Sequence, residues 1–283
     1  MTSAILVPGR PVRGRRSARN GRRLTRTSGL GLGVAMLWFS LLVLIPLTAV
    51  IVTASGAGWA EFWRAVTNEQ TAAAIQLTVG TAFLVTLVNI VMGTMIAWVL
   101  VRDDRFFGKR ALEVLIDIPF ALPTIVAGLV LLSLYGPDSP LGVNIANTRV
   151  AVLLAFLFVT LPFVVRTVQP VLAELDREAE EAAASLGASR FTVFRRIILP
   201  SLTPAIAAGA ALSFARGVSE YGSLVLLSGN LPMRTEVTSV RILSSIENDN
   251  LESAAAVAAV LLAISFAVIV AVDVIQRRVV RRG

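Results

Sequence analysis

The chain has 283 residues, 55% of them hydrophobic and 16% charged, with a mean hydropathy of +0.77. This composition excludes a soluble globular domain, in which about 25% of residues are charged. The chain contains neither Cys nor His, which excludes disulfides, thiol nucleophiles, His-based general bases and the usual zinc sites. The net charge of +8 does not indicate nucleic-acid binding, because the arginines cluster at the ends of long apolar runs, as they do in membrane proteins.

The N-terminal stretch is strongly basic. Residues 1–28 hold eight arginines, two prolines and no acidic residue, which predicts a disordered cytosolic tail. A cleaved signal peptide is disfavoured because no small-residue cleavage site follows the next apolar run. An organellar transit peptide is the second interpretation of this composition, and contact of the tail with anionic membrane lipid is compatible with either.

Six stretches are long enough to cross a bilayer, which takes roughly 20 apolar residues. They are Leu30–Thr53, Ala72–Val101, Leu112–Tyr135, Val150–Val168, Ser201–Leu227 and Ala254–Ile275. We therefore predict an all-α membrane protein with six transmembrane helices. Residues 29–74 are assigned to the first span and an external loop, residues 75–275 to the main transmembrane domain, and residues 276–283 to a cytosolic tail.

The distribution of Lys and Arg orients the spans. The N-terminal tail, the second and fourth connections and the C-terminal tail together hold twenty-one, whereas the alternate connections hold four. Because cytoplasmic loops carry the excess of basic residues, both termini and the fourth connection are predicted to lie in the cytoplasm.

The third span contains Asp117, Pro119 and Pro123, all of which are candidate pathway residues. Prolines four residues apart interrupt the backbone hydrogen-bond ladder, so this span is predicted to kink or to begin only after Pro119. One interpretation is an interfacial elbow before the true span. The other is an irregular segment that lines a cavity, where non-helical backbone is tolerated.

The fifth span carries polar residues at helical spacing. They lie three or four positions apart and form one stripe, Gly209, Ser213, Arg216, Glu220 and Ser223. A charge inside a membrane costs about 2.5–3.5 kcal/mol, so such residues normally face the interior of a bundle. Arg216 and Glu220, four residues apart, can neutralise each other. The pair either only fixes packing or belongs to a polar pathway face or gate.

The last external loop and the C-terminal span contain few residues that indicate a function. The loop Ser228–Ser253 is long and polar, and a short helix is predicted around Glu236–Ile246. Asp273 in the sixth span is within reach of the terminal arginines. No phosphate-binding GxxxxGK[ST] pattern occurs, so the chain is predicted not to hydrolyse a nucleotide by that route.

The fourth connection contains an amphipathic stretch, Glu180–Pro200, that interrupts the apolar runs. A short helix is predicted over Arg177–Leu186, with Asp176 as its N-cap and Gly187 as the left-handed residue that ends it. A second helix is predicted from Ser189, with an apolar face formed by Phe191, Phe194, Ile197 and Ile198. Pro200 is predicted to end this second helix. Such a helix pair between spans is suited to docking on another protein.

This stretch reads EAA-x3-G-x9-I-x-LP and resembles the EAA loop of the inner-membrane permease subunits of binding-protein-dependent ABC importers. The resemblance covers roughly Ile75–Ile275 and implies the type I ABC importer permease fold. In that family the loop, here residues 174–200, forms the coupling helices that dock on an ATPase subunit. The coupling residues implied for this chain are Glu180, Glu181, Ala182, Ala183, Gly187, Ile197, Leu199 and Pro200.

Three further segments, DIPFALPTIVAGL, LPFVVRTVQPVLAELDRE and SEYGSLVLLSGN, are similar to the T-type permeases of sulfate/thiosulfate importers of the bacterial inner membrane. This resemblance implies a second, homologous W-type permease, a homodimeric cytosolic A-type ATPase that uses ATP and Mg, and an external sulfate/thiosulfate-binding protein. The chain itself is implied to be a transport subunit that binds no cofactor and has no enzymatic site of its own.

Two other functions are weighed against sulfate import. Molybdate or tungstate permeases share the fifth-span pattern, which there reads GEFG, whereas this chain has Ser219-Glu220-Tyr221-Gly222. An ion-coupled secondary transporter is a remote alternative, because it would show paired broken helices in inverted repeats, and no repeat is evident. A membrane-embedded enzyme is disfavoured by the lack of His, Cys and clustered acidic residues within the spans.

Overall fold

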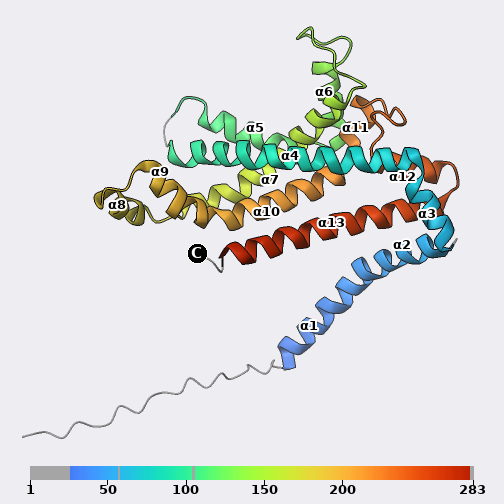
Figure 1. Cartoon of the computed structure of the whole chain (residues 1–283), viewed down its shortest axis with the longest axis horizontal. Helices are drawn as coiled ribbons and strands as arrows, with labels where there is room; N and C mark the ends of the chain where they lie inside the picture. Colours follow the sequence, from blue (N-terminus) through green and yellow to red (C-terminus); the bar gives the residue numbers. More distant parts are fainter. Residues whose placement is uncertain (1–25, 57, 104–105, 281–283) are drawn as a thin grey trace, which may run out of the picture. The chain divides into compact units, whose positions relative to one another are not determined.

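The computed structural model describes residues 26–56, 58–103 and 106–280 (Figure 1), and within these ranges all regular structure is helical. The chain divides into two compact units, Met1–Leu47 and Thr48–Gly283. The basic tail predicted for residues 1–28 lies, up to residue 25, outside the described residues, as does the end of the predicted C-terminal tail. The predicted all-α fold class is confirmed.

The first helical stretch is apolar throughout. Helix α1 (Arg26–Phe39) continues through a π-helical turn, η1 (Ser40–Leu44), into α2 (Ile45–Gly56). Ser28–Gly56 is long and apolar enough to cross a membrane, which agrees with the first predicted span. A short helix, α3 (Trp59–Thr67), follows it.

The remaining elements alternate long apolar helices with short connecting ones. They are α4 (Glu69–Arg102), α5 (Lys109–Ala121), α6 (Thr124–Tyr135), α7 (Arg149–Ala173), α8 (Arg177–Ser185), α9 (Arg190–Val193), the π-helical turn η2 (Phe194–Ile198), α10 (Leu199–Val218), α11 (Gly222–Leu227), α12 (Thr238–Glu247) and α13 (Leu251–Val280). Five helical stretches among the described residues are long and apolar enough to span a membrane, and the bent pair α5–α6 gives a sixth candidate. Helix α12 confirms the short helix predicted in the last loop.

The third predicted span, Leu112–Tyr135, is not one continuous helix. Helices α5 and α6 meet at an angle of 120°, so the predicted kink is confirmed. The break falls at Leu122 and Pro123, whose backbones are extended, and not after Pro119, which lies inside α5. Leu122, the residue before Pro123, has the extended backbone that a residue before proline prefers. The bend is compatible with both interpretations of this segment.

The fifth predicted span, Ser201–Leu227, is also interrupted. Helix α10 ends at Val218, and α11 begins at Gly222 after three residues outside any helix. The predicted stripe therefore does not lie on one helix, because Glu220 lies in the break and Ser223 on α11. The i, i+4 spacing correctly predicted the pairing of Arg216 with Glu220, but it does not indicate that the helix is interrupted between these two residues.

Pro200 does not end the second helix of the loop, contrary to the prediction. Helices α9, η2 and α10 form one continuous helix, Arg190–Val218. Proline cannot donate to the carbonyl four residues before it, and its ring clashes there. The wider turn of η2, in which the Leu199 amide donates to the Phe194 carbonyl, precedes the proline and accommodates it within the helix.

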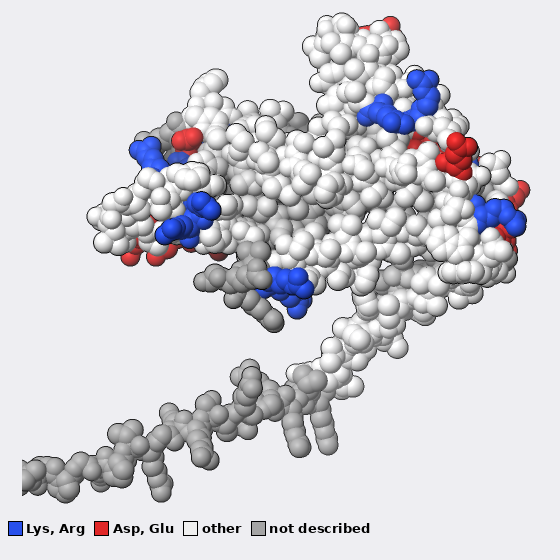
Figure 2. Space-filling view, in the orientation of Figure 1, with Lys and Arg blue, Asp and Glu red and all other residues white. Residues whose placement is uncertain are grey.

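Helices α4, α7 and α10 form the packed centre of the unit Thr48–Gly283 (Figure 1). A Cβ on Gly93 of α4 would stand 2.8 Å from the Cβ of Val164 on α7, and one on Gly209 of α10 would stand 2.9 Å from the Cα of Val164. Helices approach this closely where a small residue removes the intervening side chain. Figure 2 shows that, on the face in view, most charged side chains lie toward the two ends of the bundle.

We expect Gly209→Val to destabilise the protein. The new side chain would stand 2.3 Å from the Thr167 hydroxyl and 2.9 Å from the Val164 backbone, and overpacking of this kind costs about 1–3 kcal/mol. The thermal unfolding midpoint of the detergent-purified protein should fall. Gly31→Val is the matched control, because nothing lies within 4 Å of its Cβ position. Equal midpoints for the two variants would contradict the close packing.

Candidate functional site

The loop between α7 and α10 begins with a capped helix. The Asp176 carboxylate accepts a hydrogen bond of 2.9 Å from the Glu178 amide, so Asp176 is the N-cap of α8 as predicted. Three acidic residues, Glu178, Glu180 and Glu181, lie in the first turns of α8, where the helix dipole stabilises negative charge. The start of α8 is thus stabilised within the loop itself.

The end of α8 is equally well defined. Gly187 has a φ of +85°, and its amide donates to the Ala184 carbonyl, while the Ala188 amide donates to Ala183. This pair of bonds is the Schellman motif, which ends a helix at a left-handed residue. The predicted role of Gly187 is confirmed, and the two short helices are held at a fixed turn.

The loop presents apolar side chains to its surroundings. Leu186 is 90% and Phe191 is 70% exposed, and a groove of about 570 Å³ lies between α8, α9 and α4. Glu181 and Arg190 line this groove on opposite sides of the turn. Exposed apolar residues rimmed by charge are typical of a protein interaction surface. We call this surface, formed by α8, α9 and the Leu186–Ser189 turn, the docking surface.

Helix α4 contacts the docking surface through one ion pair, and the adjoining turn η2 through one ring contact. Glu180 on α8 forms an ion pair with Arg102, and only 19% and 16% of the two side chains are exposed. The Arg102 guanidinium also lies over the Trp98 ring, 5.2 Å from its centroid. Trp98 in turn packs edge-on against Phe194, with centroids 5.7 Å apart. The predicted coupling residue Glu180 therefore has a structural partner that the sequence did not reveal.

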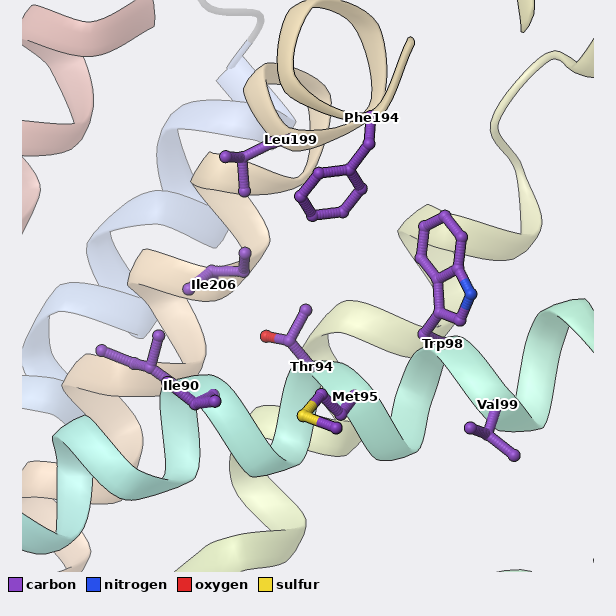
Figure 3. Close-up of a pocket in the computed structure, with 9 residues that line it drawn as sticks. Ile90, Thr94, Met95, Trp98, Val99, Phe194, Leu199 and Ile206 are labelled. Carbon is purple, nitrogen blue, oxygen red and sulfur yellow. The ribbon is translucent and has the colours of Figure 1, made fainter. Parts of the chain in front are cut away.

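Beyond these contacts, α4 and the α9–α10 helix separate around an apolar groove of about 390 Å³ (Figure 3). Thr94 and Trp98 project into it from α4, and Phe194 and Ile206 face them. The docking surface is therefore tied to α4 near Trp98, and not along its whole length.

One helix connects the docking surface to the polar residues of the fifth span. Arg190–Val218 is continuous, and at 1.5 Å per residue it is about 43 Å long. Of the predicted coupling residues, Ile197, Leu199 and Pro200 lie within this helix and do not form a separate connection. The candidate pathway residue Arg216 lies in its last turn.

Arg216 and Glu220 form an ion pair of 2.7 Å, as the spacing predicted. The Glu220 side chain is 1% exposed, and its Oε1 accepts hydrogen bonds of 2.9 Å from the amide and the hydroxyl of Ser223. The Oε2 contact with Arg216 lacks hydrogen-bond alignment, so the attraction is electrostatic. Glu220 thereby joins the end of α10 to the start of α11 across the break. Its backbone carbonyl also accepts from the Ser239 hydroxyl, which adds the segment of α12.

The other members of the predicted stripe belong to the packed centre. Gly209 lies against α7, and the Ser213 hydroxyl accepts a hydrogen bond of 3.1 Å from the Asn89 amide. Asn89, which is fully buried, also donates to the Thr160 hydroxyl at 2.8 Å, so it joins α4, α7 and α10. Sequence reasoning missed Asn89, although an amide within an apolar span is the available signal.

The candidate Asp117 pairs with Arg166, which lies within the fourth predicted span. Arg166 lies inside α7, and its Nε donates to the Asp117 carboxylate at 2.8 Å. Arg166 also donates to Gln169 at 2.9 Å. This ion pair fastens α5 to α7. The two prolines serve the backbone, with Pro119 inside α5 and Pro123 as the N-cap of α6.

Comparison with known proteins gives a match over most of the chain. Residues 89–282 match the family model described as "Binding-protein-dependent transport system inner membrane component". The sulfate transport system permease protein CysT of Salmonella typhimurium is 41% identical over 270 residues, which is 93% of this chain and 97% of that protein. The CysT protein of Escherichia coli is 40% identical over the same shares, and that of Synechocystis sp. is 41% identical over 86% of this chain and 87% of its own.

Solved structures support the fold. A bacterial alginate ABC transporter in complex with an alginate pentasaccharide-bound periplasmic protein aligns with a TM-score of 0.72, covering 89% of this chain and 94% of that one at 16% identity. An inward-facing form of the MetNI methionine ABC transporter aligns with a TM-score of 0.56, covering 73% and 94% at 17% identity. At these identities the similarity concerns the fold alone.

We expect Arg216→Met to be more harmful alone than together with Glu220→Gln. The single change leaves a buried carboxylate without its counter-charge, for which a loss of about 3–5 kcal/mol is typical. In the double variant, the introduced glutamine would still accept the bonds from Ser223 without carrying a charge. Thermal unfolding of the purified variants measures the difference.

The exposed pair Arg64–Glu61, with side chains 73% and 46% exposed, provides the matched control. Arg64→Met, alone or together with Glu61→Gln, should change the unfolding midpoint little, because exposed ion pairs contribute little stability. A double variant at Arg216 and Glu220 that unfolds at the same temperature as Arg216→Met would show that the two residues do not act as a pair.

Proposed function

The chain belongs to the family of binding-protein-dependent transport system inner-membrane components, and we propose that it moves sulfate or thiosulfate across the cytoplasmic membrane as a permease subunit. The observation that carries the proposal is the similarity to sulfate permeases over nearly the whole chain. The molybdate or tungstate alternative is not favoured, because the three relatives described above, which match over most of the chain, are sulfate permeases.

The chain is a transport component of an ABC importer and not an enzyme, and the ATPase is a separate subunit. Its partners therefore include an ATPase and a binding protein. More specifically, we propose a homodimeric A-type ATPase that uses ATP and Mg, a W-type permease as the second membrane subunit, and a sulfate/thiosulfate-binding protein outside the membrane. The chain itself would hold no cofactor.

The docking surface is the proposed contact with the ATPase. Its exposed Leu186 and Phe191 provide apolar area, and its charged rim provides specificity. We propose that this surface and both termini face the cytoplasm, because the basic residues of the connections gather on that side. The coupling residues from Glu180 to Pro200 would then lie against the subunit that hydrolyses ATP.

The mechanism follows from the continuous helix. Closure of the ATPase dimer would displace the docking surface, and the helix Arg190–Val218 would carry this displacement to Arg216. There Glu220 fastens the helix to α11, so the break between α10 and α11 would move with it. Such a movement biases a two-state equilibrium between inward- and outward-facing forms. Arg216 and Glu220 would act as part of a gate and not as ligands of the anion.

We expect Gly187→Val to lower association with the ATPase, whereas Gly187→Asn retains most of it. No atom lies within 4 Å of a Cβ at Gly187, so the φ of +85° is the only obstacle. Valine is strongly disfavoured in the left-handed region, which Asn tolerates. Co-purification of the ATPase with the tagged permease measures the effect. Equal recovery with the Val and Asn variants would contradict the role of this turn.

We expect deletion of this chain to abolish sulfate uptake. Radiolabelled sulfate uptake is measured in a strain that lacks only this chain, with and without the restored gene, and with thiosulfate or molybdate as competitor. Thiosulfate should compete, because it shares the charge and tetrahedral shape of sulfate. A deletion strain that loses molybdate uptake and keeps sulfate uptake would overturn the proposed substrate.

A further inference from the structure

A third groove lies at the end of the bundle opposite the docking surface. It has a volume of about 370 Å³ and runs between the first turns of α4 and the N-terminus of α7. Its polar lining comes from Gln76 and Thr81 on α4 and from Arg149, the first residue of α7. No carboxylate of the described residues lines it. The groove is therefore positively charged and carries neutral hydrogen-bonding groups beside the charge.

The Arg149 side chain is held in place without being neutralised. Its Nε donates a hydrogen bond of 3.1 Å to the backbone carbonyl of Arg234, which fixes the orientation of the guanidinium. Its two terminal nitrogens make no ion pair with any carboxylate of the described residues. By contrast, Arg166 and Arg216 each contact a carboxylate within the bundle. Arg149 thus retains the free donors that an anion requires.

Two features of the surrounding helices favour an anion at this place. Arg149 begins a helix of 25 residues, whose N-terminus contributes a partial positive charge. On α4, Gly80 lies one turn beyond Gln76, and nothing occupies the space within 4 Å of its Cβ position. The floor of the groove is therefore open between the Gln76 amide and the Thr81 hydroxyl.

We propose that this groove is a transient subsite for a tetrahedral oxyanion dianion. Arg149 binds the anion through its terminal nitrogens, while Gln76 and Thr81 donate to its remaining oxygens. The proposal rests on the proposed function, since it concerns the same transported anion. The subsite is weak because Arg149 and Gln76 are exposed to water, and weak binding is what a transport route requires for the ion to leave again.

The test uses the complete transporter in proteoliposomes, with the binding protein at saturating concentration. Sulfate transport and binding-protein-stimulated ATP hydrolysis are measured for Arg149→Gln, Arg149→Lys and Gln76→Leu. Arg64→Gln is the matched control, because Arg64 is already paired with Glu61 on α3. Arg149→Gln should lower sulfate transported per ATP hydrolysed roughly tenfold, as expected for the loss of one hydrogen bond to a charged group. Arg149→Lys should retain an intermediate value, and the control should match the wild type.

Each other outcome has a distinct meaning. Unchanged sulfate transport per ATP in Arg149→Gln would overturn the subsite while leaving the proposed function intact. An equal loss of transport and of stimulated ATP hydrolysis would also overturn it, because Arg149 would then dock the binding protein. A wild-type transporter that moves no sulfate would instead refute the proposed function, independently of any variant.

Discussion

The close approach of α4, α7 and α10 is the constraint on which the rest of the structure depends. Val164 lies between Gly93 and Gly209, and a Cβ on either glycine would stand within 3.0 Å of it, so these helices have little room to move past one another. Packed interfaces of this kind switch between discrete arrangements and do not deform continuously. Because α9 of the docking surface continues into α10 as one helix, a force applied at Phe191 acts on the centre of the bundle without passing through a flexible joint.

Buried polar groups also connect α4, α7 and α10. Asn89 joins three spans through the hydroxyls of Thr160 and Ser213, and its Oδ1 has no partner among the described residues. Loss of a partner from such a buried group costs free energy, so these hydrogen bonds hold the three spans in one register.

Features that depend on neighbouring residues could be predicted from the sequence, whereas features that depend on long-range contacts could not. Capping by Asp176, the left-handed Gly187 and the pairing of Arg216 with Glu220 depend on neighbours within five residues, and all were predicted. The interruption after Val218 was not, because it depends on contacts of Gly222 with α6 and of Glu220 with α12, which lie far from it along the chain. The partners of Glu180 and Asp117 were missed for the same reason.

In the proposed mechanism, different charged residues serve the movement of the helices and the passage of the anion. Glu220 is buried and neutralised by Arg216, so this pair has no net charge that would attract or repel a dianion. Its proposed role is to move together with the end of α10. Arg149 has an oriented guanidinium without a carboxylate partner among the described residues, and it lies at the end of α7 remote from the docking surface. An anion would therefore be attracted before it reaches the break between α10 and α11. Attraction at the proposed gate would hold the anion there and oppose its release, so the two proposed functions are better carried by different arginines.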